Sequence, residues 1–139
     1  MRNVTTTLRF HTRRRGLVEI TDEVRAWQQS HGVTTGLLTL FCRHTSASLL
    51  VQENAAPAVR ADLERFFAAI APEDPSRYEH DDEGPDDMPA HLRTALAGVN
   101  LSIPVIDSRM ALGTWQGIYL FEHRHGPHHR DVALHLLGE

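Results

Sequence analysis

Ten histidines stand among the 139 residues, and their placement suggests metal chemistry. Three of them, His44, His80 and His91, fall at the edges of predicted secondary-structure elements. Three neutral imidazoles with an open fourth position are the usual ligands of a catalytic zinc ion. Carboxylates next to a ligand would orient its imidazole, and Glu79, Asp81 and Asp82 lie beside the second histidine. The alternative is that all three are loop histidines exposed to water.

A second group of histidines crowds the C-terminal region. Its members are His123, His125, His128, His129 and His135. On an extended strand His123 and His125 point to the same side, so they form a short-spacer pair of possible ligands. The competing interpretation is a polar hairpin tip, with His128 and His129 on a solvated turn.

Further side chains near the first group could bind or activate a substrate. The hydroxyls of Thr45 and Ser46 can hydrogen-bond a phosphate or cap a turn. No GxSxG motif surrounds them, which argues against a serine hydrolase. Glu53 could act as a general base, and Asn54 could bind substrate or cap the following helix.

An indole and an amide stand between glycines in the segment LGTWQG. Trp115 and Gln116 would line a pocket at the entry of a strand, or Trp115 would lie in the core. Cys42 is the only cysteine, so an intrachain disulfide and a multi-cysteine zinc site are excluded. We expect it to be a small buried residue.

Hydrophobic periodicity predicts the elements that must position these residues. Strands are expected at residues 4–10, 17–20, 35–42, 101–106, 117–122 and 131–137, the second pairing with the first. Helices are expected after an N-cap at Thr21, over residues 57–71 and over residues 88–97. Strands outnumber helices without βαβ alternation, which indicates one α+β domain over residues 1–139, with mostly antiparallel sheets in a sandwich.

The composition excludes several functions. All 14 cationic residues are arginine, so a phosphate-loop lysine and Schiff-base chemistry are absent. The net charge of −4 argues against a general nucleic-acid binder. No secretory signal and no membrane span are visible, so we expect a cytoplasmic protein without a membrane partner. Residues 73–87 carry eight acids and read as one long acidic loop.

Three blocks of the sequence and its last two residues resemble the YjbQ-like family, whose members are often labelled secondary thiamine-phosphate synthase. The blocks are HTSASLLVQENAAPAVRADLERFF (44–67), YEHDDEGPDDMPAHL (78–92) and LGTWQGIYLFEHR (112–124), followed by the final Gly-Glu. The resemblance implies two antiparallel sheets with flanking helices, assembled as a homotrimer. It also implies that His44, His80 and His91 bind a metal. The chain departs most from the family pattern between Glu122 and Arg130.

Two functions follow from these observations. The first is a metal-dependent enzyme acting on a small phosphorylated molecule, with Glu53 and His44 as catalytic residues. Its substrate-binding residues would be Thr45, Ser46, Asn54, Trp115, Gln116 and Arg130. Three imidazoles favour zinc as the cofactor, although magnesium would suit the synthase label. The second function is a non-catalytic ligand-binding or accessory trimer with a structural metal.

Overall fold

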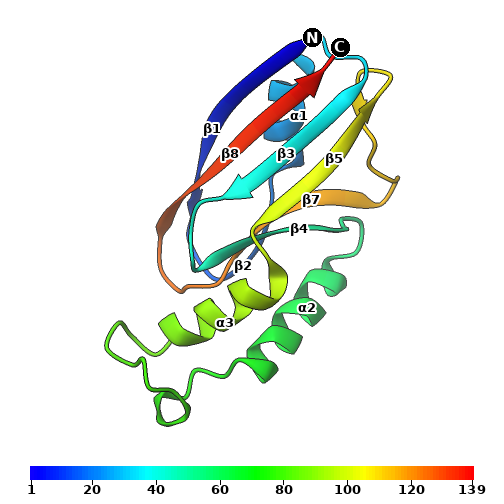
Figure 1. Cartoon of the computed structure of the whole chain (residues 1–139). Helices are drawn as coiled ribbons and strands as arrows, with labels where there is room; N and C mark the ends of the chain where they lie inside the picture. The colour runs from blue at the N-terminus through cyan, green and yellow to red at the C-terminus, as the bar shows by residue number, and fades with distance from the viewer.

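Two antiparallel sheets and three α-helices make up the computed structural model, which describes residues 1–139 (Figure 1). The larger sheet has the order β1 (Arg2–Thr12), β8 (His128–Gly138), β3 (Gly36–Cys42), β5 (Asn100–Ile106) and β6 (Arg109–Met110). The smaller sheet has the order β2 (Gly16–Glu19), β7 (Gln116–Glu122) and β4 (Ala47–Glu53). The predicted α+β class with antiparallel sheets is confirmed.

A hydrophobic core of 16 buried residues draws on both sheets. In β3 and β8 every second side chain is buried, as in Leu38 and Leu40 or Leu134 and Leu136. This alternation is what a strand with one face in the core requires. The central strand of the smaller sheet, β7, is instead buried on both faces from its second residue on.

The helices are α1 (Thr21–Gln29), α2 (Pro57–Ile70) and α3 (Asp87–Ala97), and a short 3-10 turn covers Pro75–Arg77. Pro57 occupies the first turn of α2, where its missing N–H costs nothing. Gly98 ends α3 with a φ of 88°, a conformation that suits glycine. Figure 1 shows α2 and α3 side by side below the sheets. None of the helices combines the length and the apolar character needed to cross a membrane.

Two local predictions were wrong, and one strand was missed. The segment 17–20 pairs with β7 and not with β1, because the turn after Thr12 carries the chain from the larger sheet to the smaller one. Thr21 does not cap α1: its hydroxyl donates to Glu19 and accepts the N–H of Ile118. The strand β4 was not predicted, because its sequence ASLLVQE lacks a clean alternation of polar and apolar residues.

One face of the larger sheet carries no helix. In Figure 1 this sheet lies toward the viewer with α1 behind it. Leu37 and Phe41 of β3 and Leu137 of β8 alternate with the core residues of their strands and are 43%, 49% and 42% exposed. An uncovered sheet face with large apolar side chains is typical of a protein–protein contact.

Candidate metal centre and adjoining pocket

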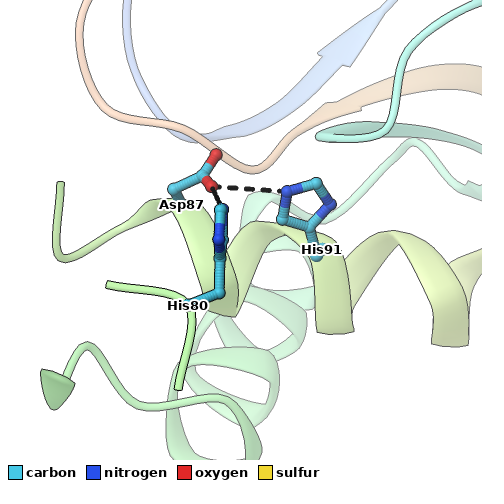
Figure 2. Close-up of side chains that lie close together, drawn as sticks. All are labelled: His80, Asp87 and His91. Carbon is cyan, nitrogen blue, oxygen red and sulfur yellow. Dashed lines mark hydrogen bonds and ion pairs between the residues drawn. The ribbon is translucent and has the colours of Figure 1, made fainter. Parts of the chain in front are cut away.

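Two of the three predicted histidine ligands lie together, on either side of a carboxylate (Figure 2). The Oδ2 atom of Asp87 lies 3.0 Å from Nε2 of His80 and 3.3 Å from Nε2 of His91. One ligand atom from each of these residues lies within 4.8 Å of the others, the separation expected of atoms that could share one ion. We call these three residues the His-Asp-His cluster.

Helix geometry accounts for part of the cluster. Asp87 is the first residue of α3, and His91 follows four positions later, so both side chains lie on the same side of the helix. Asp87 is also favoured in the first turn, because a carboxylate there interacts well with the helix dipole. His80 comes from the preceding acidic loop, whose return to the start of α3 closes the cluster.

The loop between β7 and β8 holds the carboxylates at the start of α3. The guanidinium of Arg124 donates from Nη1 to Asp87 Oδ1 at 3.0 Å and from Nε to Asp86 Oδ2 at 3.2 Å. It also donates to the carbonyl oxygen of Glu83 at 3.0 Å, and the N–H of His125 donates to Asp86 at 2.8 Å. Burial alone would raise the pKa of Asp86, but these hydrogen bonds outweigh it and lower that pKa. Arg124 therefore fixes the orientation of Asp87 and keeps its Oδ2 atom turned toward the histidines.

His80 lies in an acidic environment. Its Nε2 atom also contacts Oε2 of Glu83 at 3.0 Å, and Oδ1 of Asp82 lies 3.5 Å from Nδ1. The hydrogen bonds with Glu83 and Asp87 raise the pKa of His80. His80, Asp82 and Glu83 form a second group of possible ligands, all three of them surface residues. A cation bound by these carboxylates would compete with the proton whose binding to His80 they favour.

His44 is near the cluster but is not part of it. Its Nε2 atom accepts the backbone N–H of Asp131 at 2.8 Å, so in the neutral imidazole the proton resides on Nδ1. Burial, followed by the charge of Arg130, lowers the pKa of His44 and favours this neutral form. With one nitrogen accepting a hydrogen bond and the other protonated, His44 has no free lone pair for a metal in this arrangement.

His44 and His91 line one open pocket of about 610 Å³. The pocket lies between the end of β3, the residues that follow it, and α3; its lining includes Arg43, Thr45 and Thr94. Cys42 also lines it, and burial raises the pKa of this thiol to about 11, so it stays protonated at neutral pH. The pocket lining thus contains threonine hydroxyls and the guanidinium of Arg43, and it shares His91 with the His-Asp-His cluster.

Glu53, the predicted proton shuttle, lies away from this pocket. It is the last residue of β4, whereas His44 and Thr45 precede the first. At about 3.4 Å per residue the strand separates them by roughly 20 Å. The carboxylate of Glu53 instead accepts the N–H groups of Ala55 and Ala56 at 3.1 and 3.0 Å, at the start of α2. Within one chain Glu53 cannot exchange a proton with a molecule bound at His91.

The predicted substrate residues Asn54, Trp115 and Gln116 lie with Glu53 at that far end. Gln116 pairs with Glu53 across the sheet, and the N–H of Asn54 donates to the carbonyl of Trp115. Asn54 and Gln116 line a separate polar hollow of about 470 Å³. Trp115 is 63% exposed and so is not a core residue. The structure therefore divides the predicted site between two ends of the smaller sheet.

Arg130 is committed to an ion pair. It is 4% exposed, and its guanidinium donates to the buried Glu122 from Nε at 2.7 Å and from Nη2 at 2.5 Å. Burial would raise the pKa of Glu122, but the hydrogen bonds from Arg130, Thr12 and the Arg124 N–H outweigh it and lower that pKa. Arg130 also donates to the carbonyl of Ser46 at 3.2 Å. Arg130 of β8 thus links the larger sheet to Glu122 of β7 in the smaller sheet, and its charge is not free to bind a substrate.

The C-terminal histidines are not a hairpin tip. His123 is buried, donating from Nε2 to Ser48 Oγ at 2.8 Å and accepting from Arg93 Nε at Nδ1. It is a donor toward Ser48, so it cannot act as a base for that hydroxyl. His128 and His129 belong to β8, where they pair with Thr12 and His11.

Two residues of the site were missed from the sequence, Asp87 and Arg124. The spacing Asp-x-x-x-His between Asp87 and His91 was a usable signal, because helical residues four apart are neighbours. Arg124 carried no such signal. It lies 37 positions from Asp87, and only the folded chain brings the two together.

A family model and several known proteins match the sequence over most of its length. The family model described as "UPF0047 protein YjbQ-like" matches residues 6–139. A UPF0047 protein of Synechocystis is 52% identical over 92% of this chain and 87% of its own length. The UPF0047 protein YjbQ of Salmonella typhimurium is 48% identical, with 96% of each chain covered.

Solved structures show the same fold. A hypothetical protein from Aeropyrum pernix matches with a TM-score of 0.84 and 31% identity, with 100% of both chains covered. A conserved hypothetical protein from Thermus thermophilus matches with a TM-score of 0.82 and 37% identity, over 95% of this chain and 99% of the other. Since the sequence match extends over nearly the whole chain and the fold agrees, this protein belongs to the UPF0047, YjbQ-like family.

Proposed function

We propose that the protein is a metal-dependent enzyme that acts on a small phosphorylated molecule in the pocket beside α3. The observation that carries the proposal is the His-Asp-His cluster, in which one carboxylate oxygen lies 3.0 and 3.3 Å from two imidazole nitrogens. His91 belongs both to this cluster and to the lining of the pocket. An ion held by the cluster would therefore border the space in which a ligand binds.

The donor set fits zinc better than magnesium. Two imidazoles and one carboxylate are a known catalytic zinc set that leaves a position open, whereas magnesium prefers oxygen ligands. Bound there, zinc would polarise an oxygen of the ligand or lower the pKa of a bound water. The synthase label of the family would call for magnesium, so our proposal stops at the ligand class and does not extend to that reaction.

The chain's own groups would hold the ligand. Arg43 and Thr45 are exposed on the pocket and can donate hydrogen bonds to a phosphoryl group. His44 is held in its Nδ1–H form by the N–H of Asp131 and offers a neutral donor. Arg124 maintains the orientation of Asp87 from the side away from the histidines.

Metal analysis of purified protein tests the cluster. We expect about one zinc ion per chain in the wild type and its loss in His80→Asn, His91→Asn and Asp87→Asn. His135→Asn is the matched control, because this histidine contacts Asn3 on β1. Loss of the ion in His44→Asn as well would instead support the set of three histidines. Full retention in all of these variants would refute the metal proposal.

The second candidate function is a non-catalytic trimer in which the metal only ties the acidic loop to α3. The position of His80 on that loop favours it, because an ion shared with α3 would cross-link the two segments. Phosphorylated small molecules distinguish the candidates. An enzyme should bind one of them at Arg43 and turn it over in a zinc-dependent manner, whereas a structural metal should raise only the melting temperature.

We also propose the homotrimer, with the uncovered face of the larger sheet as its interface. Leu37, Phe41 and Leu137 lie on that face and are about half exposed. Sedimentation equilibrium should give about three times the chain mass of 15.7 kDa. Leu137→Glu should dissociate the assembly, and Phe66→Glu on the exposed side of α2 is the control. A wild-type monomer at micromolar concentration would exclude this assembly.

A further inference from the structure

A positively charged corner lies where β1 ends and β8 begins. We call it the β1–β8 corner and define it by His11, Arg13, Arg14, His128 and His129. Two hollows, of about 320 and 460 Å³, open on it and share His11, Thr12 and Arg13 in their linings. No carboxylate lines either hollow, although the chain as a whole carries a net charge of −4.

The carboxylates near the corner are already neutralised by other arginines. Arg15 forms ion pairs with Glu64 and Glu73 at 2.5 and 2.6 Å, and Arg130 forms an ion pair with Glu122. These pairs leave Arg13 and Arg14 exposed and without a carboxylate partner. Two unpaired guanidinium groups therefore remain side by side in the chain, facing water.

The turn that carries these two arginines is anchored at both ends. Before it, Thr12 is 1% exposed and donates from Oγ1 to Glu122 at 2.5 Å. After it, Arg15 is held by its two ion pairs. Because the backbone is fixed on either side, this turn loses less conformational freedom when a ligand orders Arg13 and Arg14 than a free loop would lose.

The histidines add hydrogen-bonding groups on the strand side. The rings of His11 and His129 lie edge to face with centroids 4.2 Å apart, across the β1–β8 ladder. Nδ1 of His128 donates to the carbonyl of Gly126 at 3.2 Å. Paired histidines can also bind a metal cation, but the positive charges of Arg13 and Arg14 would repel a cation. The charge of the corner therefore favours an anion.

We propose that the β1–β8 corner binds a doubly charged oxyanion, namely a phosphate group, either free or on a small molecule. Guanidinium groups match the oxygens of phosphate with paired hydrogen bonds, which gives arginine its preference for this group. The corner is separate from the pocket at His44 and His91, since the linings share no residue. This second anion site does not depend on the metal proposal.

Isothermal titration of the full-length protein with inorganic phosphate at low ionic strength tests the site. We expect the double variant Arg13→Gln/Arg14→Gln to bind phosphate roughly tenfold or more weakly, because two charge-assisted contacts are lost. The control is Arg77→Gln/Arg109→Gln, which removes the same charge at exposed positions outside the corner. An unchanged affinity in the first variant, or an equal loss in both, would overturn the proposal.

Two further titrations separate the alternatives. A phosphate monoester such as glucose 6-phosphate that binds more tightly than inorganic phosphate supports a phosphorylated molecule as ligand, and equal or weaker binding supports free phosphate. Zinc chloride, followed by the ring-proton NMR signals of the histidines, tests for a cation. If zinc shifts the signals of His11 and His129 and binds more tightly in Arg13→Gln/Arg14→Gln, the corner is a metal site and the anion proposal is wrong.

Discussion

The buried imidazole of His123 should make the protein less stable in mild acid. The ring is 1% exposed and lies between the hydroxyl of Ser48 and the guanidinium of Arg93, which donates from Nε to Nδ1 at 3.0 Å. If Nδ1 of His123 carried a proton, its N–H would face the Nε–H of Arg93, and neither donor would have an acceptor there. Burial, followed by the charges of Arg93, Arg130 and Arg15, lowers the pKa of His123 to about 2.

The size and sign of the effect follow from proton linkage. In the unfolded chain a histidine binds a proton near pH 6.5, whereas the folded protein keeps His123 neutral down to a pH of about 2. Below pH 6.5 the unfolded state therefore binds more protons, and the free energy of unfolding falls as the pH falls. Between pH 6.5 and pH 4.5, His123 alone lowers the free energy of unfolding by about 2 kcal/mol.

Urea denaturation at pH 6.5, 5.5 and 4.5, followed by circular dichroism, measures the effect. His123→Gln is the informative variant, because its amide can still donate to Ser48 and accept from Arg93 without titrating. Its free energy of unfolding should fall less between pH 6.5 and 4.5 than that of the wild type, by about 2 kcal/mol. His135→Gln should keep the wild-type profile. If His123→Gln loses stability as steeply as the wild type, the buried neutral state of His123 is refuted.

Three further predictions concern the site and its surroundings. Arg124→Gln should weaken zinc binding roughly tenfold or more, because Asp87 loses the group that orients it; competition with a chelating dye measures this. Glu122→Gln should lower the free energy of unfolding by about 3–5 kcal/mol in urea denaturation, because it leaves the charge of Arg130 buried without a counter-charge. Trp115→Ala should change it by less than about 1 kcal/mol, because the indole is 63% exposed.

Most elements of the fold could be predicted from local pattern. The alternation of apolar residues in β1 and β8 and the 3.6-residue period of α2 each follow from one face turned toward the protein, which is buried in β8 and only partly buried in β1 and α2. The pairing of β2 could not be predicted in this way. A short turn usually joins neighbouring strands of one sheet, but here the turn after Thr12 connects two sheets, and the buried Thr12–Glu122 hydrogen bond that holds it is a long-range contact.

The histidines show the same division between local and long-range information. His80 and His91 lie 11 positions apart, and a loop returning to the start of α3 is enough to bring them together. The sequence left two interpretations for His123, a possible ligand paired with His125 or part of a polar hairpin tip, and neither placed it in the interior. Its burial depends on Arg93 of α3 and Ser48 of β4, neither of which is near it in the sequence.

Glu53 shows how closeness in sequence can mislead about closeness in a site. Glu53 lies only nine positions after His44, inside one block of the family resemblance, and a carboxylate near a histidine suggests acid–base chemistry. An intervening strand, however, moves the chain by about 3.4 Å per residue, so β4 places the two residues at opposite ends of the smaller sheet. Asp87 and Arg124, 37 positions apart, are in contact because β7 runs back antiparallel to β4 and ends beside α3. If the proposed enzyme transfers a proton at the His-Asp-His cluster, the group that does so is therefore expected around α3 and the residues after β3, or in the Glu53 of another subunit of the proposed trimer.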